Sequence, residues 1–190
     1  MSTIKKNPNR KTRLPGDPDR DQAVERMIRV DHAGEYGAVR IYEGQLSVLG
    51  KSASAPVIEH MAEQERRHLD AFNKLVPERR VRPTALLPLW HAAGFALGAG
   101  TALLGEKAAM ACTVAVEEVI EEHYAGQIAQ LEADGGEGEL LDTLEKFRQE
   151  EVEHKETGLD HGALDAPGYE ILSGAVKAGS RLAIWLSTRL

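Results

Sequence analysis

The stretch from Glu35 to Leu46, which reads EYGAVRIYEGQL, decides the fold because a close copy of it returns 82 residues later. The copy, from Glu117 to Ile128, reads EEVIEEHYAGQI. Glutamate, tyrosine, glycine and glutamine hold the same four places in both stretches, and an aliphatic residue follows the glutamine. Self-similarity at a fixed distance is typical of a duplicated structural unit. The chain is therefore predicted to contain two copies of one helix.

Each copy is followed by a second helix that carries a Glu-x-x-His motif. Glu65-Arg-Arg-His68 lies 30 residues after Glu35, and Glu151-Val-Glu-His154 lies 34 residues after Glu117. The four extra residues fit in the glycine-rich loop near Gly135. Because residues i and i+3 share one face of a helix, each glutamate and its histidine can point at the same spot.

Two single glutamates and two Glu-x-x-His pairs make a ligand set of four carboxylates and two imidazoles. This is the ligand set of di-iron and di-manganese carboxylate bundles, and mixed oxygen and nitrogen donors suit iron. Without metal, four acids facing a core would be costly to ionise. The alternative is that these residues lie on solvated faces of acidic helices. The predicted ligands of two iron ions per chain are Glu35, Glu65, His68, Glu117, Glu151 and His154.

The rest of the pattern predicts an all-α chain, a ferritin-like four-helix bundle with extra apolar and C-terminal amphipathic helices. Apolar residues recur at helical spacing, Gly50 ends the first helix, and Pro56 suits the first turn of the second. The bundle helices are predicted at residues 21–49, 56–75, 106–133 and 138–159, and a last helix follows Pro167 and reaches Leu190.

Two apolar segments lie outside these four helices. Residues 83–105 contain no Asp, Glu, Lys or Arg. About 20 apolar residues would span a membrane, but Pro88, His91 and the many small residues favour a buried or interfacial helix. For the amphipathic last helix, a core-facing position and a position at a membrane surface both stay open. Two such segments favour attachment to a membrane surface and a lipid-like substrate.

Length and charge narrow the class of protein. The 190 residues suffice for one domain with a sizeable core, predicted at 21–190 after a disordered basic tail at 1–20. The tail has no apolar region of the kind that a secretory signal needs. The net charge of -7 argues against nucleic acid as a partner. The single cysteine, Cys112, excludes an internal disulfide and is expected to pack in the core.

Several neighbours of the predicted ligands are candidates for supporting roles. Glu121, one turn beyond Glu117, fits a hydrogen bond to a ligand and solvent exposure equally well. Glu150 could orient His68 through the outer ring nitrogen. His32 fits a place near the site as well as a capping or surface role.

Two tyrosines and a histidine follow the repeated glutamates. Tyr42 and Tyr124 lie two turns beyond them and could donate hydrogen bonds near the metals, although core packing is favoured for Tyr42. His123 lies beside Tyr124, and both are candidate substrate contacts. Gly98-Ala-Gly100 resembles the start of a dinucleotide loop, but no strand precedes it, so the electron donor is expected to be external.

With these residues in place, the chain resembles the demethoxyubiquinone hydroxylase family of ubiquinone biosynthesis. The resemblance runs from about residue 25 to the C-terminus. Its matching stretches are Val30–Ala38, Glu65–His68, Ala111–Glu118, Glu151–His154, Gly158–His161 and Arg181–Leu186.

The resemblance implies an O2-dependent monooxygenase that hydroxylates the ring of a polyprenylated demethoxyubiquinol, the penultimate step to ubiquinone. NADH or the quinol would supply electrons. The enzyme would be peripheral on the cytoplasmic side of a bacterial inner membrane, with other ubiquinone-biosynthesis proteins or further copies of itself as partners. His123 and Tyr124 would lie near the quinone head group, and the two apolar segments would hold the isoprenoid tail.

Three other functions fit parts of the pattern. A ferritin-like protein for iron oxidation and storage would carry a charged outer surface and no long uncharged segment. A hydroxylase of a tRNA base would carry a basic face, which a pI near 5.5 disfavours. A metal-free adaptor at a membrane surface would tolerate the loss of Glu65.

Overall fold

The computed structural model describes residues 18–135 and 138–190, so the predicted tail lies almost entirely outside the described residues. Every regular element in the described part of the chain is a helix. The helices are α1 (Arg20–Leu49), α2 (Ala55–Glu78), α3 (Leu87–Leu103), α4 (Glu106–Ala133), α5 (Gly138–Asp160) and α6 (Tyr169–Ser187), with a short 3-10 helix at Ala163–Asp165.

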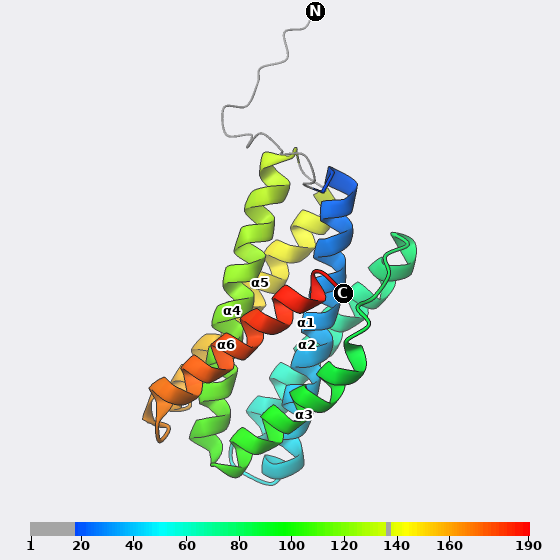
Figure 1. The fold of residues 1–190 in the computed structure, drawn as a ribbon. Coiled ribbons are helices and arrows are strands. Elements are labelled where there is room, and N and C mark those ends of the chain that lie inside the picture. Colours follow the sequence, from blue (N-terminus) through cyan, green and yellow to red (C-terminus); the bar gives the residue numbers. More distant parts are fainter. Residues whose placement is uncertain (1–17, 136–137) are drawn as a thin grey trace, which may run out of the picture.

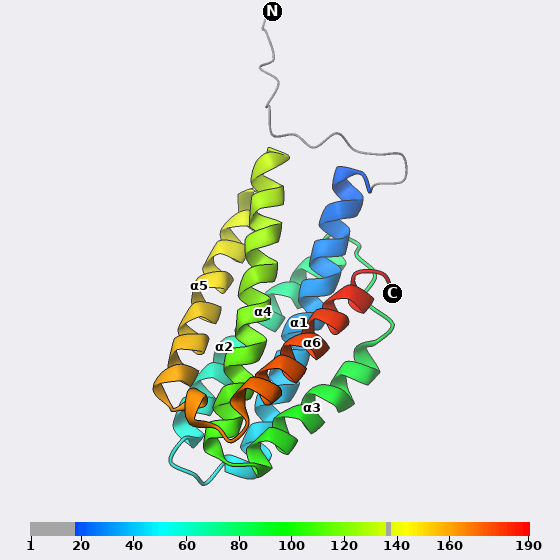
Figure 2. The ribbon, with the colours of Figure 1, turned by 60° about the vertical axis from the view of Figure 1, so that its left-hand side comes forward.

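Helices α1, α2, α4 and α5 form the four-helix bundle, which confirms the predicted fold class (Figure 1). Helix α1 packs along α2, and α4 packs along α5, so the bundle is built from two helix pairs. The two added helices cover one face of this bundle, where α3 packs on α1 and α6 packs on α4. Both views place α3 and α6 next to each other on this face (Figure 2). The duplicated sequence thus becomes a duplicated pair of helices with a cover.

The predicted helix limits hold within a residue or two, except at two ends. Helix α2 continues to Glu78 and includes Pro77, because a proline in the last turn removes only the hydrogen bond that its own nitrogen would donate. Helix α6 ends at Ser187 rather than at Leu190. At the start of α1, Asp19 accepts a hydrogen bond from the Gln22 backbone and the Gln22 side chain accepts one in return, a capping box that fixes the first turn.

Helix α3 approaches α1 closely through glycines. A Cβ on Gly98 would lie 1.9 Å from the Ile41 carbonyl oxygen, and a Cβ on Gly44 would lie 2.3 Å from the Phe95 oxygen. Only glycine permits backbones to meet at this distance. The Gly98-Ala-Gly100 stretch therefore lies inside a helix, as its rejection as a nucleotide loop required.

The outer sides of α3 and α6 are apolar and exposed. Leu103 is 75% exposed and Ile171 is 81% exposed. The prediction of a buried or interfacial helix thus resolves for α3 into a narrow buried side with apolar residues on its outer side. Among the described residues, no helix combines the length and apolar character needed to cross a membrane.

Candidate metal centre

The six predicted ligand side chains meet in the middle of the bundle. Helices α1 and α4 each contribute one glutamate, and α2 and α5 each contribute a glutamate with a histidine one turn later. Each of the six residues is at most 2% exposed. The first alternative, solvated faces of acidic helices, is therefore wrong for Glu35, Glu65, His68, Glu117, Glu151 and His154.

The six side chains form two groups that share two carboxylates. Each group has four donor atoms within 4.8 Å of one another. The first group combines Glu35 and His68 with the shared pair, and the second combines Glu117 and His154 with the same pair. The shared residues are Glu65 and Glu151. Each group could hold one metal ion, and the two shared carboxylates lie where they can bridge the ions.

The buried atoms that lack hydrogen bonds are those that face the centre of each group. They are Glu35 Oε2, both carboxylate oxygens of Glu65 and Glu151, Glu117 Oε2, His68 Nδ1 and His154 Nδ1. His68 Nδ1 lies 3.2 Å from Glu151 Oε1, and His154 Nδ1 lies 3.0 Å from Glu65 Oε1. A buried polar atom without a hydrogen bond costs about 1–3 kcal/mol. Cations at the two positions would satisfy these atoms, so the residues fit a pair of metal ions.

The outward-facing atoms of the two single glutamates are taken by tyrosines from the opposite half. The Tyr42 hydroxyl donates to Glu117 Oε1 at 2.8 Å, and the Tyr124 hydroxyl donates to Glu35 Oε1. Tyr42 is 2% exposed and packs in the core as favoured, but its hydroxyl also holds a predicted ligand. Burial is the main reason that the pKa of each tyrosine is raised well above its usual value, so both hydroxyls keep the proton that they donate.

The outer ring nitrogens of the two histidines also have partners. His68 Nε2 is hydrogen-bonded to the Glu150 carboxylate, which is the predicted contact. His154 Nε2 lies 3.2 Å from Gln64 Oε1. A histidine that donates from Nε2 presents the lone pair of Nδ1 to a metal. Gln64 was missed by sequence reasoning, although it precedes Glu65 just as Glu150 precedes Glu151.

Burial and mutual proximity shift the pKa values of the central groups. Burial, reinforced by the Glu151 charge, raises the pKa of Glu65 to about 8. Burial alone would lower the pKa of a histidine, but the surrounding carboxylates outweigh it and raise His68 to about 12 and His154 to about 11. Burial also opposes ionisation of Glu151, yet hydrogen bonds from both histidines lower its pKa to about 2. The cluster therefore favours positive charge at its centre, whether protons or metal ions.

Three other candidates have structural partners away from the centre. Glu121 forms an ion pair with Lys155 at the surface of the bundle, so its expected hydrogen bond to a ligand is absent from the contacts of this side chain. His32 is 6% exposed and lies 3.1 Å from Asn73 Oδ1, which makes a surface role wrong. Cys112 is fully buried in the core, as predicted, and burial raises the pKa of its thiol to about 12.

His123 belongs to a hydrogen-bonded group that the sequence did not reveal. Its Nε2 atom lies 3.1 Å from Asp31 Oδ1 and 3.0 Å from Gln127 Nε2. Asp31 is 3% exposed, and burial is the main reason that its pKa is raised. An aspartate on a helix is normally exposed, so its position in the sequence gave no signal of this role.

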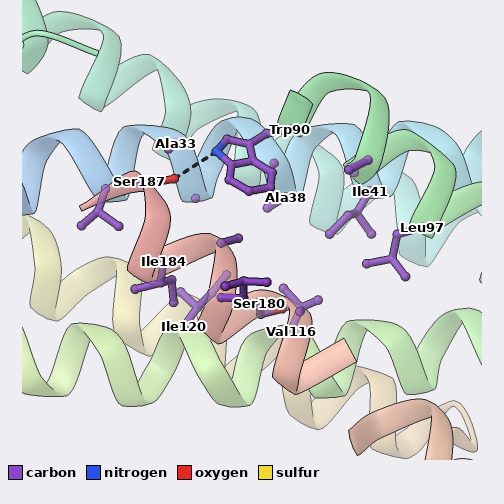
Figure 3. Close-up of a pocket in the computed structure, with 18 residues that line it drawn as sticks. Ala33, Ala38, Ile41, Trp90, Leu97, Val116, Ile120, Ser180, Ile184 and Ser187 are labelled. Atoms are coloured by element: carbon purple, nitrogen blue, oxygen red, sulfur yellow. Dashed lines mark hydrogen bonds between the residues drawn. The ribbon is translucent and has the colours of Figure 1, made fainter. Parts of the chain in front are cut away.

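An apolar cavity of about 410 Å³ lies between α1, α3, α4 and α6, beside the metal centre (Figure 3). Gly34 and Ala38 of its lining flank Glu35, and Val116 and Ile120 flank Glu117. These four residues hold equivalent places in the duplicated helices, so the cavity lies over both halves of the centre. Neither His123 nor Tyr124 is among its lining residues, and contact of these two with a substrate stays a prediction.

One hydrogen bond ties together the helices that cover the cavity. The Trp90 indole nitrogen on α3 donates to Ser187 Oγ at the end of α6, at 3.0 Å (Figure 3). Ala85 N also donates to Leu190 O at 3.3 Å. The start of α3 is thus fixed to the end of α6, and the other lining residues are almost all apolar.

Comparison with known proteins extends over the whole bundle. The model of the family described as ubiquinone biosynthesis protein COQ7 matches residues 22–187. A 3-demethoxyubiquinol 3-hydroxylase of Rhodospirillum rubrum is 59% identical over 94% of this chain and 84% of its own length. The NADPH-dependent 3-demethoxyubiquinone 3-hydroxylase of human mitochondria is 58% identical over 88% of this chain and 78% of its own. A 5-demethoxyubiquinone hydroxylase of Saccharomyces cerevisiae is 43% identical, with the same coverage.

Proposed function

The chain belongs to the COQ7 family of ubiquinone biosynthesis proteins, and on this premise we propose that it hydroxylates the ring of a polyprenylated demethoxyubiquinol with O2. The names of its relatives support this reaction. The observation that carries the proposal is the apolar cavity, which lies directly beside a buried group of carboxylates and imidazoles. Relatives named as hydroxylases give no support to iron storage, the alternative function.

Two iron ions per chain are proposed as the cofactor. Glu35 and His68 would hold one ion, Glu117 and His154 the other, and the two shared glutamates would contact both. When bound, such ions supply the activation of O2 that hydroxylation of a ring requires. The electrons would come from outside the chain, either from a reduced nicotinamide, as the name of the human relative suggests for that enzyme, or from the quinol.

The cavity would bind the ring of the substrate and exclude water from it. Gly34 and Ala38 on one side and Val116 and Ile120 on the other leave space between α1 and α4, one helical turn or less from Glu35 and Glu117. The small residues in this gap allow a planar ring to approach the ligands. Tyr42 and Tyr124 would hold the outer oxygens of the two glutamates, which keeps the inner oxygens directed at the metals.

The isoprenoid tail would leave the cavity along α3 and α6 toward a membrane surface. The two helices share a set of exposed apolar side chains, which are Leu89, Leu103, Leu104, Ile171, Leu182 and Trp185. A monomeric soluble protein rarely exposes so many large apolar residues together, and such surfaces mark membrane or protein contacts. We place this surface on the cytoplasmic side of a bacterial inner membrane; a homo-oligomer and partner proteins of the same biosynthesis stay predictions.

A substitution at Gly34 tests the proposal. A Cβ at Gly34 meets no atom within 4 Å and points toward the cavity that the residue lines, so Gly34→Leu should fill the cavity without distorting α1. We expect normal iron content but at least a tenfold loss of quinol hydroxylation, measured by mass spectrometry of the product. Gly126→Leu on exposed α4 surface, where a Cβ also has open space, is the matched control. Undiminished hydroxylation by the Gly34→Leu chain would contradict a substrate site in this cavity.

A further inference from the structure

The two halves of the metal centre are related by the sequence duplication, so their differences can be compared position by position. Helices α1 and α4 correspond at an offset of 82 residues, and the Glu-x-x-His motifs of α2 and α5 at an offset of 86. The ligands and the two tyrosines are the same in both halves. A residue that differs between the halves therefore marks where one metal position is made unlike the other.

The first difference is the partner of the metal-binding imidazole. Glu150 and Gln64 hold equivalent places, each directly before a shared glutamate. His68 donates to the carboxylate of Glu150, whereas His154 donates to the amide oxygen of Gln64 at 3.2 Å. A carboxylate acceptor makes an imidazole a stronger metal ligand than a neutral acceptor does, because it stabilises positive charge on the ring.

The second difference falls on the same half. In one half, Gln127 donates to the carboxyl group of Asp31 at 2.8 Å. In the other half, the equivalent Gln45 donates to the hydroxyl of Thr113 at 3.3 Å. Asp31 interacts electrostatically with Glu35, which belongs to the group of His68. Both extra carboxyl groups thus stand behind one metal position, and neutral groups stand behind the other.

The ring of His68 is also held more firmly than that of its counterpart. It stacks on Phe147 with ring centroids 4.0 Å apart, whereas the nearest aromatic ring to His154 among the described contacts with non-ligand residues is Tyr42, edge-on at 6.2 Å. Fixing a ligand in its binding geometry lowers the entropy lost when the metal binds. This contact favours the same metal position as the two carboxyl groups.

We propose that the two metal positions are inequivalent, and that the position at Glu35 and His68 binds its ion more tightly and fills first because Glu150 and Asp31 support it. The inference rests on the proposed di-iron function and adds the roles of Glu150 and Gln64 as positioning residues. The position at Glu117 and His154 binds its ion more weakly.

Anaerobic titration of the full chain with ferrous iron, followed by calorimetry, tests the proposal. The unaltered chain should show two binding steps, the first at least tenfold tighter. Glu150→Gln should weaken the first step about 10- to 100-fold, the usual effect of removing a partner of a metal-bound histidine. Glu153→Gln, on an exposed position of the same helix, is the matched control and should leave both steps unchanged. His154→Ala should keep the tight step, and His68→Ala should remove it.

An exchange of the two partners separates positioning from folding. In the double variant Glu150→Gln with Gln64→Glu, the carboxylate stands behind His154, so the tight step should now survive His68→Ala and be lost in His154→Ala. A general loss of structure cannot move the tight step from one histidine to the other. Circular dichroism verifies that each variant is folded.

Two results would overturn the inference. One is a pair of equal steps in the unaltered chain, and the other is a tight step that stays with His68 after the exchange. Either result in a chain that still hydroxylates the quinol would leave the proposed function intact. Conversely, two unequal steps in a chain without hydroxylase activity would count against the proposed function alone.

Discussion

At the scale of single residues, Glu65 is the ligand whose loss should harm both metal positions, because it belongs to both groups. We expect Glu65→Ala to lower the iron content from about two ions per chain to less than one and to abolish hydroxylation, since each position loses a carboxylate. Colorimetric iron analysis of the purified protein measures this. Glu63→Ala, one exposed position away on the same helix, should keep both ions. Full iron content in the Glu65→Ala chain would show that this residue is no ligand.

Metal binding at these residues should also depend on pH. With pKa values of about 12 for His68, 11 for His154 and 8 for Glu65, these groups carry protons at neutral pH that a metal ion must displace. Lower pH favours the protons and higher pH favours the metal, so ferrous affinity should rise between about pH 6 and 8, with release of about two protons or more per chain. Calorimetry in buffers of different ionisation enthalpy counts the protons. An affinity independent of pH would contradict this electrostatic account.

The ligand residues could be predicted from the sequence because their spacing and duplication are written along the chain. Glu150 could be proposed for the same reason, as a neighbour of a ligand. Asp31 and Gln64 could not, because their roles depend on which residues of another helix they face. A helical period states which face a residue occupies, but it does not state what lies opposite.

At the scale of helices, the α1–α3 contact depends on glycines that meet backbone atoms. Gly98→Ala would force its Cβ into the Ile41 carbonyl and should lower the free energy of unfolding by about 1–3 kcal/mol. Gly100→Ala, two residues along, meets no atom within 4 Å and should be neutral or stabilise by up to about 1 kcal/mol. Thermal unfolding of the two variants compares them directly. Equal melting temperatures would show that α3 does not pack on α1 as described.

The bundle helices were predictable from apolar spacing and from the residues that end helices, and α4 has the predicted limits. The position of α3 was not, because an uncharged segment has no polar face to show which side is buried. Its close approach to α1 is written only in Gly44 and Gly98, whose partners are distant in the sequence. The extension of α2 through Pro77 was missed because proline is a weaker break in a last turn than in a helix interior.

At the scale of the whole molecule, the apolar outer side of α3 and α6 should bind membranes. Leu103 and Leu104 are 75% and 69% exposed, and burying one leucine side chain contributes about 1.5–3 kcal/mol. The double variant Leu103→Glu with Leu104→Glu should therefore lose at least tenfold in binding to phospholipid vesicles, measured by co-sedimentation. Ala129→Glu with Gln130→Glu adds the same charge on exposed α4 surface and should bind as before. Equal binding by both variants would place the membrane contact elsewhere.

The cavity, the covering helices and the buried ligands together make up one proposed di-iron hydroxylase, and the number of iron ions per chain tests that claim most directly. The chain is loaded with ferrous iron without oxygen, exposed to air and freed of unbound metal before its iron is measured. The account predicts about two ions per chain. A value near zero would contradict the metal centre, and many ions per chain would indicate iron storage instead.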